Sequence, residues 1–195
     1  MPFYKRIQYN SPLILTYALV ALAVLILNYI TGGASNALAF SIHRSALADP
    51  LFYVRMVGHV LGHANVQHYF DNMVLILLVG PMLEEKYGGK WLGIMMLVTA
   101  IVTGVLFLAV SEHALLGGSG LVFMLILLSS FTNLQRGRIP LTLVLAITIF
   151  IGREVDAVRG AAAIGTNISH LTHIIGGVCG AVFGYVFNKS ELVDG

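Results

Sequence analysis

Four polar side chains interrupt apolar stretches of the sequence, and their types can do chemistry. Ser119 stands in GGSG (117–120), His173 in THIIGGVCG (172–180), and His68 and Asn72 in HANVQHYFDN (63–72). A serine hydroxyl becomes a nucleophile when a neighbouring base, most often histidine, accepts its proton. The sequence therefore raises the possibility of nucleophilic catalysis, provided that the fold brings these groups together.

Three glycines surround the serine at the head of the apolar run LVFMLILLSSF. Gly117, Gly118 and Gly120 permit unusual backbone angles and close approach of other groups. The first N–H groups of a helix have no partner within the helix, so a helix that starts here presents free donors beside the serine. We expect this stretch to present a hydroxyl and backbone donors to an enclosed, wet pocket.

A ridge of small residues follows His173. Gly176, Gly180 and Gly184 continue its helical face, with spacings of three, four and four residues. Faces of this kind let membrane helices pack closely. The ridge therefore predicts that the helix bearing His173 packs against a neighbouring backbone, with the Gly-Ser-Gly around Ser119 as the candidate.

Each feature also has a simpler interpretation. A serine in a membrane helix commonly bonds back to its own helix, and a histidine on an apolar face is commonly a packing residue. The spacing of His59 with His63, and of His170 with His173, would suit a metal site, but the sequence contains no HExxH motif. Metal binding stays a minor alternative, and Cys179, on another face from His173, is expected to be a small core residue.

The composition indicates an integral membrane protein. Of 195 residues, 57% are hydrophobic and only 10% are charged, whereas soluble domains carry about 25% charged residues. The net charge of +2 comes from few charges, without the basic stripe that nucleic-acid binding needs, so no nucleic-acid partner is expected. A single cysteine excludes an internal disulfide.

Six apolar stretches can be interpreted as membrane spans of an all-α bundle. Since a span needs about 20 apolar residues, we place them at 12–30, 68–83, 91–110, 115–132, 140–151 and 171–187, the fifth being short. A long mixed segment, 31–67, follows the first span. We expect one domain over 1–195, with a short stub, 1–11, and a core of about 12–188.

Charge and helix geometry place the four polar groups at one depth. With the N-terminus inside, seven of the eleven basic residues flank the inner face. At about 1.5 Å per residue, Ser119, His173, His68 and Asn72 then lie about 18–24 Å from that face. Polar groups this deep in a bilayer usually face a cavity and are functional. Their shared depth therefore predicts a single site.

In this order, the motifs resemble those of the rhomboid family of intramembrane serine proteases, in its bacterial six-helix form. GGSG resembles the G-x-S-G nucleophile motif, and His63, His68 and Asn72 match an H-x4-H-x3-N element. His173, Gly176 and Gly180 match the H-x-x-G-x-x-x-G of the last core helix, and EEKYG (84–88) resembles the E-x-x-x-G that closes the second helix. These motifs extend over most of residues 55–185.

The resemblance implies a Ser–His dyad of Ser119 and His173. It also implies an oxyanion hole formed by the Ser119 backbone N–H, His68 and Asn72. The supporting residues would be Gly117, Gly118, Gly120, Phe123, His63, Gly176, Gly180 and Glu84. Glu84 would be structural, tying down the inner end of the second span, and the segment 31–67 would be a partly membrane-embedded loop.

Two positions differ from the family pattern, and neither removes a catalytic group. Val54-Arg55 stands where the family often has Trp-Arg, and Phe123 where a tyrosine is common; Phe123 can still stack on His173. The resemblance implies an active endopeptidase that cleaves in or near transmembrane segments of other membrane proteins. It implies no metal or organic cofactor, contact with membrane lipid, and a multi-pass location in a bacterial inner membrane. A catalytically inactive binder of membrane helices and a histidine-lined metal transporter remain as alternatives.

Overall fold

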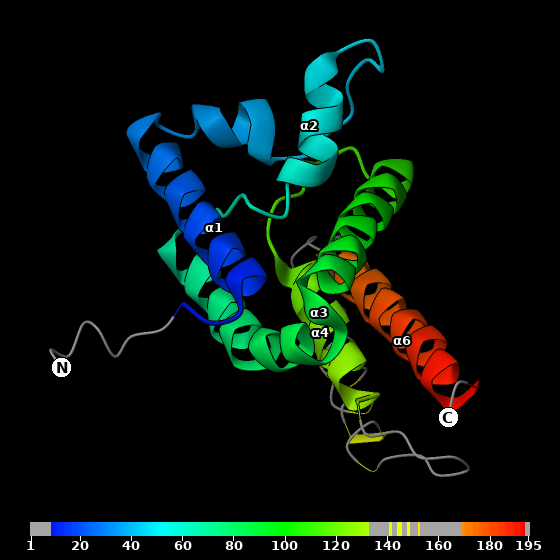
Figure 1. Cartoon of the computed structure of the whole chain (residues 1–195). Helices are drawn as coiled ribbons and strands as arrows, with labels where there is room; N and C mark the ends of the chain where they lie inside the picture. Colours follow the sequence, from blue (N-terminus) through cyan, green and yellow to red (C-terminus); the bar gives the residue numbers. More distant parts are fainter. Residues whose placement is uncertain are drawn as a thin grey trace, which may run out of the picture.

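A computed structural model of the chain describes residues 9–132 and 169–193, together with Leu141, Val144, Leu145, Thr148 and Gly152. Along the chain the elements are α1 (Pro12–Ile30), η2 (Asn36–Phe40), α2 (Pro50–Gly58), α3 (Val66–Val110), α4 (Ser119–Ser130) and α6 (Ser169–Val193). Regular structure in these ranges is helical, as predicted (Figure 1). The predicted fifth span, 140–151, lies mostly outside the described residues.

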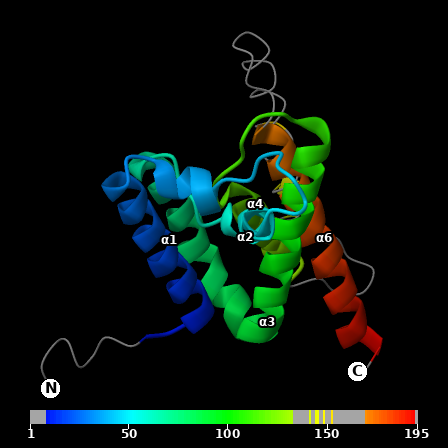
Figure 2. The ribbon, with the colours of Figure 1, turned by 90° about the horizontal axis from the view of Figure 1, so that it is seen from above.

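The second and third predicted spans form one kinked element, α3. Gly88 has φ 77° and ψ 147°, which breaks the 45-residue helix into two arms. Figure 2 shows α3 as a V whose first arm lies beside α1 and whose second arm lies beside α4 and α6. A left-handed backbone angle favours glycine, so Gly88 permits the sharp reversal between the arms. The arms confirm the two predicted spans, although the first begins at Val66, not His68.

The first arm of α3 is bound, near the kink, to the start of α1 through Glu84. The two carboxylate oxygens of Glu84 accept hydrogen bonds from the backbone N–H groups of Leu13 (2.9 Å) and Ile14 (3.0 Å). Ser11, which precedes α1, makes no side-chain capping bond. The buried Glu84 therefore satisfies donors at the first turn of α1 from another helix, where a negative charge is also favoured.

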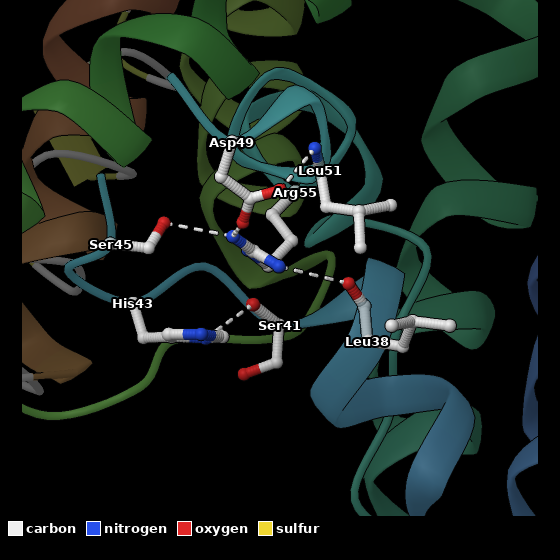
Figure 3. A network of polar contacts seen from close by, with 7 residues as sticks. All are labelled: Leu38, Ser41, His43, Ser45, Asp49, Leu51 and Arg55. Atoms are coloured by element: carbon white, nitrogen blue, oxygen red, sulfur yellow. Dashed lines mark hydrogen bonds and ion pairs between the residues drawn. The ribbon is translucent and has the colours of Figure 1, made fainter. Parts of the chain in front are cut away.

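The segment between α1 and α3 is organised around a buried arginine. Arg55 on α2 is 4% exposed. Its guanidinium donates to the Leu38 carbonyl (3.1 Å), to the Ser45 hydroxyl (2.8 Å) and to the Asp49 carboxylate, as Figure 3 shows. The hydrogen bond from Arg55 lowers the pKa of Asp49, which also accepts from Leu51 N–H as the N-cap of α2. These bonds join α2 to η2 and to the loop between them.

The glycine ridge on α6 packs directly against the backbone of α4. A Cβ atom built on Gly176 would overlap the carbonyl oxygen of Gly120, and one built on Gly180 would overlap that of Met124. At Gly184 it would lie 2.5 Å from the Phe131 ring. The two helices therefore touch through main-chain atoms at Gly176 and Gly180, where the predicted close approach is observed, while Gly184 packs on the Phe131 ring.

α4 begins within the GGSG stretch, where a helix start beside the serine is predicted, but the predicted span begins four residues earlier. The apolar run was expected to form a span over 115–132, but the helix covers only Ser119–Ser130. Leu115 instead forms an antiparallel bridge with Ile42, with two N–H···O bonds of 2.9 Å. Glycines at 117 and 118 favour non-helical backbone, so the chain enters α4 as an extended segment and Ser119 becomes its first residue.

Three of the described helices are long and apolar enough to cross a membrane: α1, α3 and the part of α6 over His170–Phe187. α3 contributes two such passes because of its kink. α4 is apolar but has only 12 residues. The shared core is made of Ile14, Tyr17, Ile76, Leu83, Leu92, Met95, Leu121, Met124, Leu125 and Leu128.

Substitution of Gly176 by alanine should separate α4 from α6. The added methyl group overlaps the Gly120 carbonyl, and over-packing of this kind costs about 1–3 kcal/mol. We expect Gly176→Ala to lower the thermal unfolding midpoint in detergent. Gly93→Ala is the matched control, because its methyl group would meet Leu13 at an ordinary 3.6 Å. Equal midpoints for the two variants would contradict this packing.

Removal of the Glu84 carboxylate should loosen the start of α1. Glu84→Ala leaves two backbone donors without their partner, and the loss of a helix cap costs about 0.5–2 kcal/mol. We expect a lower thermal midpoint for this variant in detergent. Glu85→Ala is the control, since Glu85 is the exposed neighbour on the same helix. An equal effect of the two substitutions would rule out the capping role.

Candidate functional site

The turn that leads into Ser119 is held from one side by the segment between α1 and α3. Gly117 N–H donates to the His59 carbonyl (2.9 Å), just beyond the Ile42–Leu115 bridge. Gly117 has φ 126°, a conformation that residues with side chains rarely adopt. The glycine requirement at this position is therefore conformational as well as steric.

Tyr17, a residue of α1, packs against the same turn at Gly118. A Cβ atom on Gly118 would lie 2.6 Å from the Tyr17 hydroxyl, which itself donates to the Val60 carbonyl at 2.6 Å. Tyr17 is almost fully buried. The Tyr17 hydroxyl and the Val60 carbonyl thus form the surface on which Gly118 rests, and only a residue without a side chain fits there.

His68 lies against the turn. A Cβ atom on Gly117 would lie 2.7 Å from Cε1 and 2.8 Å from Nε2 of the His68 ring, but 3.9 Å from Nδ1. The Cε1–Nε2 edge of the imidazole therefore faces the backbone just before Ser119. The His68 ring is partly exposed, and its backbone N–H donates to the side chain of Asn65, the N-cap of α3.

Asn72 lies one helical turn after His68. It is 4% exposed, and its side-chain amide nitrogen donates to the His68 carbonyl at 2.9 Å. A carboxamide carries two N–H donors, so this bond orients the side chain while using one of them. Asp71, next to it in the sequence, is exposed and accepts from Gln67 at 2.7 Å. It therefore lies on the surface of α3.

The contact between α4 and α6 brings the predicted serine and histidine to neighbouring positions. A Cβ atom on Gly120 would lie 3.5 Å from the Thr172 carbonyl oxygen. Ser119 directly precedes one of these residues and His173 directly follows the other. The Phe123 ring lies 4.5 Å from that of His173, centroid to centroid, at an interplanar angle of 36°. The predicted stacking of Phe123 on His173 is thus present in the structure.

Two further histidines near this motif, His59 and His63, lie inside the protein. His59 and His63 are 1% and 0% exposed, and burial lowers the pKa of each to about 4, so both rings are neutral at physiological pH. In the part of the chain that the structure describes, no three His, Cys, Asp or Glu side chains are grouped as a metal site requires. The spacing that suggested metal ligands instead packs these two rings inside the protein.

Sequence reasoning missed Tyr17, Tyr69 and Asn36. Tyr17 supports the turn, the Tyr69 hydroxyl donates to the Ala18 carbonyl (3.1 Å), and the Asn36 amide donates to the His63 carbonyl (3.0 Å). All three bonds join residues at least 27 positions apart. The only sequence signal was the position of Tyr17, whose hydroxyl lies within the apolar run of α1. That position did not indicate Val60 as the hydrogen-bond partner.

The apolar helices, their membrane-spanning length and the buried polar groups define a multi-pass integral membrane protein. Residues 51–190 match the family model for the Rhomboid domain. The chain therefore belongs to the rhomboid family. It is also similar to Rhomboid-related protein 2 of Mus musculus, with 28% identity over 156 residues, which cover 72% of this chain. The chain spans about half the length of that relative.

Loss of the Tyr17 hydroxyl should disturb the turn before Ser119 and also lower the thermal stability of the protein. Tyr17→Phe leaves the buried Val60 carbonyl unpaired, which costs about 1–3 kcal/mol. Tyr69→Phe is the matched control, because it removes a comparable tyrosine–carbonyl bond away from the turn. We expect both variants to unfold at lower temperature, but only Tyr17→Phe to alter backbone hydrogen exchange at 117–120. Identical exchange there would contradict the supporting role of Tyr17.

Proposed function

We propose that this protein is an intramembrane serine endopeptidase that cleaves peptide bonds in or near transmembrane segments of other membrane proteins. The observation that carries the proposal is the turn at Gly117–Ser119. In it, Gly117 lies against the His68 ring edge and Ser119 is the first residue of α4, the helix whose Phe123 ring packs on His173. Membership of the rhomboid family supports the same conclusion.

In the proposed reaction, the Ser119 hydroxyl oxygen attacks the substrate carbonyl carbon while His173 takes the hydroxyl proton. His173 then gives this proton to the leaving amine as the peptide bond breaks, which leaves an acyl group on Ser119. Water, with His173 again as base, hydrolyses the acyl-enzyme and restores both groups. The stacked Phe123 ring restricts the orientation of the imidazole during both transfers.

Three donors would stabilise the oxyanion in this reaction: the Ser119 backbone N–H, Nε2–H of His68 and the second amide N–H of Asn72. The first is unpaired by helix geometry, because the N–H groups at the start of a helix lack intrahelical acceptors. The Nε2 edge of His68 faces the turn, and Asn72 is oriented by its bond to the His68 carbonyl. Donors held in place before the reaction usually make the largest contribution to catalysis.

The orientation and location of the protein belong to the same proposal. The excess of basic residues on one side favours a cytoplasmic N-terminus, so water would reach Ser119 from the outer face. We assign the protein to a bacterial inner membrane, by analogy with the family. Substrates would be membrane-spanning helices that unwind locally, and the proposed reaction uses no metal or organic cofactor.

The decisive test is cleavage of a single-span reporter by the purified protein, with and without EDTA. We expect Ser119→Ala and His173→Ala to lower kcat by about 10³-fold or more, and EDTA to have no effect. Ser129→Ala and His113→Ala are matched controls. The Ser129 hydroxyl bonds to the Ile126 carbonyl near the end of α4, and His113 is exposed in the loop before the turn.

Labelling with a fluorophosphonate probe separates the alternatives. A protease should label at Ser119 in the wild type and not in Ser119→Ala, whereas a non-catalytic binder of membrane helices should label in neither. Full activity in either dyad variant would overturn the assignment of Ser119 and His173. Loss of cleavage in EDTA would favour a metal-dependent reaction.

A further inference from the structure

His63 has a buried ring nitrogen that makes no hydrogen bond to the residues that the structure describes. The side chain is 0% exposed, and its Nδ1 lies 3.1 Å from the Leu61 carbonyl oxygen. Its Nε2 is buried without a partner among the described residues. A carbonyl oxygen can only accept, so Nδ1 carries the proton, and Nε2 of the neutral ring presents a lone pair. No donor among the described residues therefore reaches the lone pair on Nε2.

A second unpaired acceptor belongs to the residue that holds this histidine. Asn36 donates its amide to the His63 carbonyl at 3.0 Å, while its own side-chain oxygen is buried and has no partner in the described part of the chain. An unsatisfied buried polar group costs about 1–3 kcal/mol. Buried water commonly satisfies such groups, and each molecule offers two donors. Nε2 of His63, like Oδ1 of Asn36, therefore needs a donor that the described residues do not supply.

The ring of His68 adjoins that of His63, with centroids 5.2 Å apart in an edge-to-face arrangement. Its Cε1–Nε2 edge faces Gly117, and Nδ1 lies farther from the turn. If Nε2 of His68 donates to an oxyanion, the neutral ring must carry its proton on Nε2, and Nδ1 becomes an acceptor. His63 Nε2 and His68 Nδ1 are then both acceptors and cannot bond directly to each other.

We propose that a buried water molecule bridges Nε2 of His63 and Nδ1 of His68, donating one hydrogen bond to each ring. The water holds His68 in the tautomer that carries its proton on Nε2, toward Gly117 and Ser119. His63 is thereby a positioning residue that acts through the water on His68. The tautomer of His68 and its catalytic consequence rest on the proposed function, whereas the His63 nitrogen that lacks a donor among the described residues does not.

Two substitutions at position 63 test the roles of the two ring nitrogens of His63 separately. His63→Gln places an amide near the position of Nε2, and His63→Asn places one near the position of Nδ1, which keeps the donor to Leu61 but removes the contact with the water. Solid-state NMR of the protein labelled with ¹⁵N-histidine, in lipid, reports the tautomer of each ring. The His68 signals are assigned by comparison with His68→Gln.

We expect His68 to carry its proton on Nε2 in the wild type and in His63→Gln, and to populate the Nδ1–H tautomer in His63→Asn. Reporter cleavage should fall about tenfold in kcat in His63→Asn, with KM unchanged. This loss is smaller than the 10²–10³-fold expected for removal of an oxyanion donor itself. The glutamine variant should keep most of the activity.

The proposal is overturned if wild-type His68 carries its proton on Nδ1, for instance as a donor to Asp71, or if neither variant changes the tautomer. A loss of stability and activity in both variants with an unchanged tautomer would also overturn it, because His63 would then be structural only. If the wild type cleaves nothing, the proposed function fails while the NMR result still decides the water site.

A crystal structure of the wild type provides a second readout that needs no variant. Density for a water within hydrogen-bond distance of both nitrogens supports the bridge. Protein atoms packed in that space exclude it.

Discussion

The backbone contact between α4 and α6 determines where the candidate site can form. Lipid tails are as apolar as leucine, so helices in a membrane associate through close packing and hydrogen bonds instead of hydrophobic burial. Gly176 on α6 packs against the Gly120 carbonyl of α4, with no room for a side chain. His173 lies one turn before Gly176, and Ser119 lies one residue before Gly120. The same contact that joins the helices therefore sets the distance between serine and histidine.

The opposite wall of the site comes from the segment between α1 and α3. Arg55 is bonded to Leu38, Ser45 and Asp49, and its carbonyl accepts from His59 N–H at 3.2 Å. The His59 carbonyl in turn accepts from Gly117 N–H. A continuous series of bonds thus runs from the buried guanidinium to the turn before Ser119. Because this segment is mostly loop and short helix, its geometry depends on such bonds more than on regular structure.

The sequence predicted the features that follow from spacing and composition. The spans at 12–30 and 91–110, the glycine ridge against α4 and the stacking of Phe123 on His173 all follow local rules, and the structure contains them. The sequence did not predict the contacts of Tyr17 with Val60 and of Asn36 with His63, because each is a single hydrogen bond between residues far apart in the chain. The predicted span 115–132 begins four residues before α4, because the apolar run includes Leu115, whereas the bridge to Ile42 keeps that residue extended.

The candidate site contains neutral polar groups, and the buried charged side chains lie away from it. The two buried charged side chains among the described residues are Glu84, which caps α1, and Arg55, which pairs with Asp49. Around Ser119 the groups are backbone amides, a carboxamide and imidazole rings. An isolated charge at this depth is costly, whereas a hydrogen bond gains strength where the dielectric is low. The surroundings that disfavour a resident charge thus make neutral donors effective, provided that each is held in a fixed direction. This requirement accounts for the number of contacts that fix the orientation of His68, Asn72 and His173.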